Sequence, residues 1–472
     1  MKRTEVSRAS EHPNVELEKL IVVSGISHKA LAARVNQHCA AMGKPASYTH
    51  TSIANWISGM IPRWPAPQAI AAALSERLGH PVSVTEIGMP QSATTSPDIG
   101  LDFPRDLPAA IDTATAWWVL GDRMNRREFN QLTFAAATFT TPVTRWLIQP
   151  SDPSAAADRS QVRRVGAADI AELHEAAEHA RRIDSKYGGL SSGSTLTACL
   201  RERAVPLLKG TYSDAIGRRL FAVTAQLGRL AGYSAWDLGH QARAQRHYIQ
   251  ALRLARAAGD VPLGGYALAS MSLQAGLNGF CEDAVDMAQG AFERTRHNAT
   301  PRTLAFFKLV EARAHARAAR LHGRAHAGRA AGQALAQAET LLGQARPSDD
   351  DPDWIDFFTY PRLAADATEI HRDLRMPHMV MRFEALATMP ADTYTRSCGM
   401  RNAIVGSAHL HAHHLDEGLQ YGHRAVDILS QVASIRSLTY VKDLLEALQP
   451  WKAETRVQEF HHRVRRELRV PA

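Results

Sequence analysis

The sequence has little of several residue types that would point to other classes of protein. Aromatic residues make up only 7% of its 472 residues, and it has four cysteines. These cysteines, Cys39, Cys199, Cys281 and Cys398, form no CxxC pair, which fits reduced thiols better than a disulfide framework or a zinc site. No run reaches the ~20 apolar residues of a membrane span, and the N-terminus has no signal-peptide core. We therefore expect a soluble, cytoplasmic protein that contacts no membrane.

Acidic residues are missing from one long stretch. Between Lys19 and Ser75 there is no Asp or Glu. The basic residues of the stretch are Lys19, Lys29, Arg34, Lys44 and Arg63. The surface of a soluble bundle normally mixes charges of both signs. A surface that carries only positive charge suits the phosphate backbone of a nucleic acid, because binding then releases counterions. The formal net charge of +8 is compatible with such a partner.

A short amphipathic helix is predicted inside this stretch, from Thr49 to Ser58. Thr49 can cap its start, and Gly59 can follow its end. A period of 3.6 places Ile53, Trp56 and Ile57 on one face, and Thr51, Ser52, Asn55 and Ser58 on the other. Close-fitting donors and acceptors of this kind read base edges in the DNA major groove. An ordinary helix of a small bundle is the alternative interpretation.

Three further helices are predicted around it, at residues 15–23, 28–36 and 68–78. Gly25 would end the first, and Ser27 would cap the second. The connection 37–47 is longer than the tight turn of a standard helix-turn-helix. We interpret it as an extension of the second helix, followed by a loop around residues 43–45.

A helix-turn-helix head of this kind predicts DNA contacts at the start of its second helix, in the connection and on the third helix. The candidate residues are Ser27, His28, Lys29, Lys44, Thr49, His50, Thr51, Ser52, Asn55 and Arg63. The expected partner is double-stranded DNA. A homodimer is expected, because one short helix reads too few bases for useful specificity.

From about residue 212 the sequence is repetitive. The second helix of each unit carries small or aromatic residues at offsets of four and three, and the units follow one another at about forty residues. The sets are Ala244, Tyr248 and Ala251; Ala284, Ala288 and Ala291; Ala331, Leu335 and Ala338; Met379, Phe383 and Leu386; and Gly418, Gly422 and Ala425. Gly232 and Gly406 each stand twelve residues before a set. The pattern resembles the tetratricopeptide repeat, whose period is ~34 residues, and generic helical hairpins are the alternative.

The predicted fold is all-α, with an N-terminal helix-turn-helix bundle followed by a tetratricopeptide-like α-solenoid. We place a DNA-binding domain at 14–88, a linker at 89–108, connecting helices at 109–150 and the repeat domain at 160–472. Stacked repeats form a concave surface. There we expect Tyr233, Trp236, Tyr266 and Asn278 to bind a ligand.

Two features of the composition carry further expectations. Residues 311–330 alternate Ala, Arg and His, which predicts a solvated basic helix face, with a second nucleic-acid patch as the alternative. His409 and His413 share one helical face, but no Cys or clear carboxylate partner is near, so we expect no metal and no cofactor. The sequence has no P-loop and no nucleophile elbow. We therefore expect no catalytic residues and no enzyme.

Two segments resemble known proteins. The pattern Ile53-x-x-Trp56-x-x-Gly59 resembles the recognition helix of phage-repressor-like (XRE-type) helix-turn-helix domains. Residues 182–190, with 220–260, look like the helical C-terminal region of large actinobacterial transcriptional regulators. That resemblance implies DNA binding in the control of development or secondary metabolism, and repeats that sense an effector. A peptide is the first expectation and a small metabolite the second. A repeat scaffold whose N-terminal bundle docks protein is the alternative function.

Overall fold

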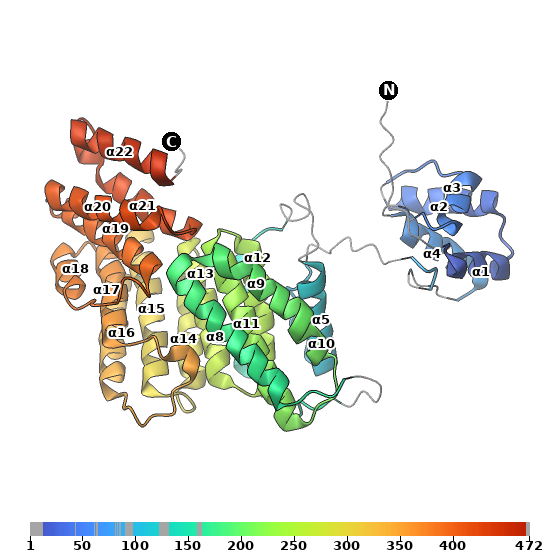
Figure 1. Cartoon of the computed structure of the whole chain (residues 1–472), viewed down its shortest axis with the longest axis horizontal. Helices are drawn as coiled ribbons and strands as arrows, with labels where there is room; N and C mark the ends of the chain where they lie inside the picture. Colours follow the sequence, from blue (N-terminus) through green and yellow to red (C-terminus); the bar gives the residue numbers. More distant parts are fainter. Residues whose placement is uncertain are drawn as a thin grey trace. The chain divides into compact units, whose positions relative to one another are not determined.

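The computed structural model describes residues 13–42, 44–60, 62, 65–80, 82, 84, 86–89, 98–121, 132–157 and 163–468 (Figure 1). The chain divides into two units, Met1–Pro97 and Asp98–Ala472. The described residues form helices and isolated bridges without any β-strand, which confirms the predicted all-α fold. None of the helices in these ranges is both long enough and apolar enough to cross a lipid bilayer.

Four helices make up the N-terminal unit. They are α1 (Val15–Ser24), α2 (His28–Ala41), α3 (His50–Ile57) and α4 (Ala66–Leu78). Their core contains the buried side chains of Leu17, Leu31, Val35 and Ile53. Gly25 ends α1 with φ of 63°, a conformation that glycine adopts without steric cost. The four helices lie where the sequence predicted them, and α2 extends to Ala41 as expected.

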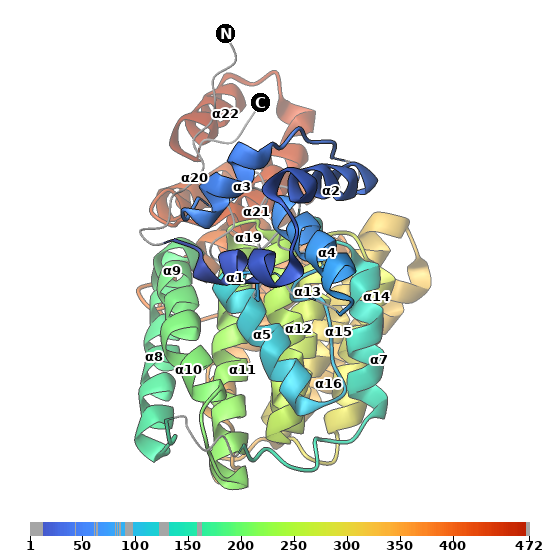
Figure 2. The ribbon, with the colours of Figure 1, turned by 90° about the vertical axis from the view of Figure 1, so that its right-hand side faces the viewer.

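Five helical hairpins form the main part of the C-terminal unit (Figures 1 and 2). The pairs are α11 (Asp214–Asp237) with α12 (Gln241–Ala258), α13 (Val261–Leu277) with α14 (Cys281–Thr295), α15 (Pro301–His322) with α16 (Ala325–Gln344), α17 (Tyr360–Asp373) with α18 (Pro377–Glu384), and α19 (Thr395–His411) with α20 (Leu415–Leu429). The helices α21 (Ile435–Ala447) and α22 (Thr455–Leu468) follow. The paired antiparallel helices agree with the predicted repeat array.

Small residues allow the paired helices to approach closely. Ala244, Ala284 and Ala331 are fully buried. A β-carbon added to Gly232 would lie 2.6 Å from the ring of Tyr248, so the two helices pack with the ring directly over the glycine. The predicted packing positions are thus confirmed for these units.

The fourth unit departs from the predicted pattern. Leu386 is 41% exposed, because α18 already ends at Glu384 and its packing face stops there. The prediction of a packing position at Leu386 is wrong, whereas Phe383 is buried as expected.

The segment before the repeats packs on α12. Arg246 donates to the carbonyl of Ile99 at 2.9 Å, and Gln250 donates to that of Gly100 at 2.8 Å. The helices α5 (Leu107–Leu120) and α7 (Thr140–Ile148) also lie against α12. Residues 98–108, which we placed in a linker, are therefore held by the repeats, because side chains of α12 satisfy their backbone carbonyls. Residues 90–97 of that predicted linker lie outside the described residues.

Helices that are far apart along the C-terminal unit contact one another. α8 (Ala167–Tyr187) touches α19, and α11 touches α21. The fully buried carboxylate of Asp237 on α11 accepts from Arg396 and from Arg436, each at 3.0 Å. Because these arginines belong to α19 and α21, the ion pairs join the two ends of the array around its concave side.

The arginines of α15 are placed differently from the prediction. Arg313 donates to Glu369 on α17 at 2.6 Å, and Arg320 donates to Asp443 on α21 at 2.7 Å. Their side chains are only 14% and 18% exposed. The expected solvated basic face is therefore wrong for these two residues, since acidic partners from distant helices cover them. It is also wrong for Arg317, whose side chain is 13% exposed and pairs with Asp373 at 3.7 Å. Arg324 and Arg329 are exposed, as predicted.

Candidate functional site

The helix α3 presents a polar surface from the N-terminal unit. Ile53 is fully buried and Trp56 is 5% exposed, so one side of α3 is fixed in the core. His50 and Thr51 are exposed, while Ser52 and Asn55 are half-buried. The two faces that the sequence predicted are therefore present. Such a helix can enter a groove only with its short polar side chains foremost.

Hydrogen bonds fix both ends of the connection between α2 and α3. Asn36 on α2 accepts from the backbone N–H of Tyr48 at 2.8 Å and donates to its carbonyl at 3.0 Å. Ser52 accepts from the backbone N–H of Thr49 at 3.2 Å, which caps α3. Ser27 caps α2 by accepting from Ala30 at 3.3 Å. Three of the predicted DNA-contacting residues, Ser27, Thr49 and Ser52, thus take part in capping.

The positive charge of this unit is partly neutralised. Lys19 pairs with Glu16 at 3.1 Å, and Arg34 pairs with Glu76 at 3.3 Å. These acidic residues stand just outside the acid-free stretch of the sequence. Lys29, at the start of α2, and Lys44, in the connection, are exposed. Arg63 lies outside the described residues.

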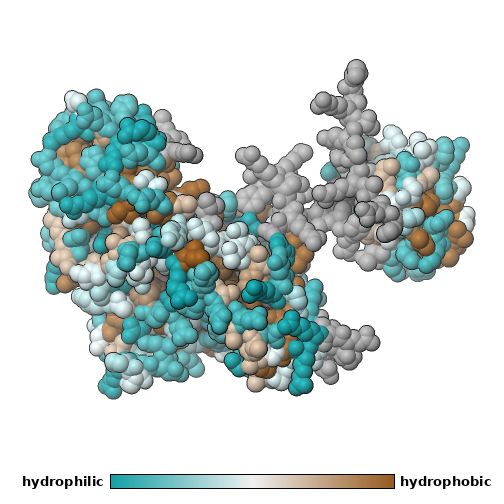
Figure 3. Space-filling view, viewed as in Figure 1, coloured by the Kyte–Doolittle hydropathy of each residue, from teal (hydrophilic) through white to brown (hydrophobic). Residues whose placement is uncertain are grey.

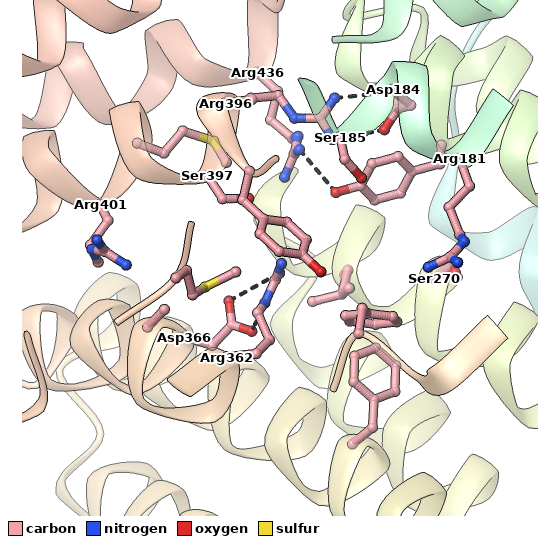
Figure 4. Close-up of a pocket in the computed structure, with 18 of the residues that line it drawn as sticks. Arg181, Asp184, Ser185, Ser270, Arg362, Asp366, Arg396, Ser397, Arg401 and Arg436 are labelled. Atoms are coloured by element: carbon pink, nitrogen blue, oxygen red, sulfur yellow. Dashed lines mark hydrogen bonds and ion pairs between the residues drawn. The ribbon is translucent and has the colours of Figure 1, made fainter. Parts of the chain in front are cut away.

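A cavity of about 530 Å³ lies within the C-terminal unit. Its walls come from α8, α11, α13, α15, α17, α19 and α21, together with residues 389–394 and 356–357. Figure 4 shows Arg396 and Arg436 on one side of it, and Arg362 with Asp366 on another. The cavity therefore occupies the concave side that the ion pairs of Asp237 close.

The polar lining of the cavity is rich in arginine. Nine of its lining residues are Arg or Lys, and five are Asp or Glu. Several of the arginines are paired: Arg396 donates to Asp184 at 2.8 Å, and Arg362 donates to Asp366 at 2.8 Å. The excess of cations leaves the cavity with net positive charge.

Aromatic side chains form the other part of the lining. Tyr266 stacks on Trp354 with their ring centroids 4.6 Å apart and lies edge-on to Phe306 at 5.6 Å. The guanidinium of Arg229 lies over the Tyr266 ring, 4.1 Å from its centroid. The guanidinium therefore makes a cation–π contact with a ring that is itself packed against two other aromatic side chains.

The cations of the cavity act on the phenol of Tyr233. Its hydroxyl accepts from Arg436 at 3.0 Å, and the guanidinium of Arg396 is 5.3 Å from its ring centroid. Burial opposes ionisation of this phenol, but the charges of Arg436 and Arg396 outweigh burial and lower its pKa. By contrast, burial raises the pKa of Tyr266. The region around Tyr233 therefore stabilises negative charge.

The N-terminal unit has a counterpart among known families. Residues 17–90 match the family model of the SP15 N-terminal domain. The matched segment spans most of α1 and all of α2, α3 and α4. No curated protein matches the chain.

The predicted ligand residues are divided by the structure. Tyr233, Trp236 and Tyr266 line the cavity. Asn278 is not among its lining residues: its amide donates to the side chain of Gln241 at 3.0 Å and to the carbonyl of Gln274 at 2.8 Å, at the end of α13. The sequence predicts Asn278 as a polar residue of the concave surface, but its amide bonds to groups at the end of α13.

The arginines of the cavity were absent from the sequence prediction. Arg229 stands four residues before Tyr233 and seven before Trp236, so helical periodicity places the three on one face of α11. That spacing was a usable signal. Arg396 and Arg436 gave no such signal, because their partner Asp237 lies 159 and 199 residues away in the sequence.

Proposed function

We propose that this chain is a DNA-binding transcriptional regulator. Its N-terminal unit binds double-stranded DNA, and its C-terminal unit binds an effector, a peptide or a small molecule, and mediates self-association. The observation that carries the proposal is the orientation of α3, whose apolar face is buried by Ile53 and Trp56 while His50 and Thr51 are exposed.

Charge supports DNA as the partner of the N-terminal unit. Lys29 and Lys44 are exposed, and the stretch from Lys19 to Ser75 contributes no carboxylate of its own. Exposed lysines beside a polar helix face give phosphate contacts that position the helix and leave base contacts to specify the sequence.

The effector role is supported by the cavity of the C-terminal unit. Its volume of about 530 Å³ is typical of small-molecule sites. An effector changes DNA binding only if it has different affinities for two states of the protein. Self-association follows from the need of a short helix for a second half-site about one helical turn, ~34–36 Å, away.

The test is binding of the full chain to duplex DNA at increasing salt concentration. We expect the logarithm of the affinity to fall linearly with the logarithm of the salt concentration. Genomic footprinting of the intact protein should then give paired half-sites. Absence of any salt-dependent duplex binding would contradict the proposal.

A protein-docking scaffold is the second candidate. Val22 and Val23 on α1 are 75% and 73% exposed, and Figure 3 shows hydrophobic residues on the surface of the N-terminal unit. Exposed aliphatic side chains of this kind suit a protein partner better than phosphate. If Val22→Ser with Val23→Ser abolishes a protein interaction and leaves duplex binding unchanged, the scaffold role stands beside DNA binding. If the chain binds no duplex at all, the scaffold role replaces it.

A further inference from the structure

One buried cation in the cavity has no partner for its hydrogen bonds. Arg229 is only 7% exposed, and within the described ranges its guanidinium makes a hydrogen bond or ion pair to no protein group. A guanidinium has five N–H donors, and buried donors are normally satisfied. Its contact with the Tyr266 ring supplies attraction but no acceptor oxygen. A ligand in the cavity can therefore supply acceptors to Arg229.

The neighbouring arginines are already paired with carboxylates. Arg313 binds Glu369, Arg362 binds Asp366, and Arg396 binds Asp184. Arg229 differs from all three, because it contacts the Tyr266 ring and no carboxylate of the described residues pairs with it. An anionic group of a ligand would supply the negative charge and the two acceptor oxygens for a bidentate contact with Arg229.

The remaining lining defines the rest of the ligand. Leu230, Leu273, Leu309 and Val310 are apolar, and Phe306 extends this surface. Exposed lining residues, such as Arg182 and Lys186, mark the mouth of the cavity. The ion pair between Asp237 on α11 and Arg396 on α19 bounds one side of the cavity.

We propose that this cavity binds a small organic anion, with its carboxylate or similar oxyanion on Arg229 and a flat apolar body against the Phe306 side. The inference rests on the proposed effector role of the C-terminal unit and names the class of effector. Arg229 is the residue that selects for the anionic group.

The test uses two probes of one shape, naphthalene-2-carboxylate and naphthalene-2-carboxamide, with the full chain in the absence of DNA. Calorimetric titration should show that the carboxylate binds about tenfold or more tightly than the amide, because hydrogen bonds to charged groups are the stronger ones. Arg229→Met keeps the length of the side chain and should remove this preference. Arg219→Met, at an exposed position of the same helix, should retain it.

Several results would overturn the inference. They are equal binding of the two probes by the unaltered chain, no carboxylate binding at millimolar concentration, or an unchanged preference in Arg229→Met. Binding of an extended acidic peptide without either probe would overturn it in favour of a peptide site. If Arg229→Met does not fold, the comparison of probes on the unaltered chain still decides. Failure here leaves the salt-dependent DNA binding to be judged separately.

Discussion

The side chain of Asn36 pairs with the backbone of Tyr48 in both directions, accepting at 2.8 Å and donating at 3.0 Å. The side-chain amide thus makes the two hydrogen bonds that a backbone peptide group of a neighbouring strand would make. It ties the long connection after α2 to the start of α3, where a standard helix-turn-helix uses a tight turn. This amide therefore helps to orient the candidate recognition helix, together with the buried side chains of Ile53 and Trp56.

Removing this amide should loosen α3 without unfolding the C-terminal unit. Asn36→Ala deletes two hydrogen bonds and should destabilise the N-terminal unit by about 1–3 kcal/mol. Amide hydrogen exchange in the full chain should then be faster in α3 and unchanged in α11–α16. Gln37→Ala, at an exposed neighbouring position, serves as the control. Equal protection of α3 in both variants would show that other contacts fix the helix.

Substitutions on the two parts of the N-terminal surface should affect DNA binding differently. Asn55→Ala should reduce the binding free energy for the preferred operator by about 1–3 kcal/mol and relax the sequence specificity, since its contacts to base edges are lost. Lys29→Ala should weaken all duplexes similarly and reduce the salt slope by about one. Lys209→Ala, an exposed lysine of the C-terminal unit, is the control for charge. An equal loss on random and cognate DNA for Asn55→Ala would remove it from the recognition surface.

Two helical glycines should respond to alanine with opposite signs. A β-carbon at Gly232 would lie 2.6 Å from the buried Tyr248 ring, so Gly232→Ala should destabilise by about 1–3 kcal/mol through overpacking. Gly332 on α16 has nothing within 4 Å, so Gly332→Ala should stabilise by about 0.5–1 kcal/mol. Thermal melts of the two variants give the comparison. A rise in Tm for Gly232→Ala would mean that the ring can move aside.

The closure of the repeat array should depend on Asp237. Its carboxylate neutralises Arg396 and Arg436 while fully buried. Asp237→Ala leaves these cations under-compensated and should destabilise the C-terminal unit by about 3–5 kcal/mol. The control is Asp416→Asn, whose side chain is 80% exposed in its pair with Arg456 and which should leave the melt unchanged. Similar melts for both variants would show that the closure contributes little to stability.

Acid should destabilise the C-terminal unit through His247. The indole N–H groups of Trp117 and Trp118 both lie 3.3 Å from its Nδ1, which must therefore be unprotonated. Burial, with a smaller effect of Arg243, holds the pKa of His247 well below its usual value near 6.5. The unfolded chain then binds the extra proton as pH falls below that value, and stability is lost by up to about 1.4 kcal/mol per pH unit.

The measurement is denaturant unfolding from pH 7 to pH 5. The unaltered chain should lose stability over this window more steeply than His247→Asn. His326→Asn, at an exposed position of α16, should follow the unaltered chain. If all three show the same pH dependence, His247 is not its source.

The sequence by itself determined the helices and their faces. Thr49 and Ser27 precede helices that begin where they were predicted, because capping is a local property of the chain. The buried positions Ala244 and Ala284 followed from helical periodicity, since a repeated face needs the same small residues.

Only the tertiary structure decided which charged side chains are buried and which acidic residues pair with the arginines. Arg320 was expected in water, but Asp443, 123 residues further along the chain, pairs with it. Arg396 and Asp184 meet across 212 residues. No local pattern encodes such pairs, because an ion pair depends on where folding brings two distant helices together. The arginine-rich cavity arises in the same way. Each of its walls is predictable as a helix, but which side chains line the cavity depends on how the helices of the array come together.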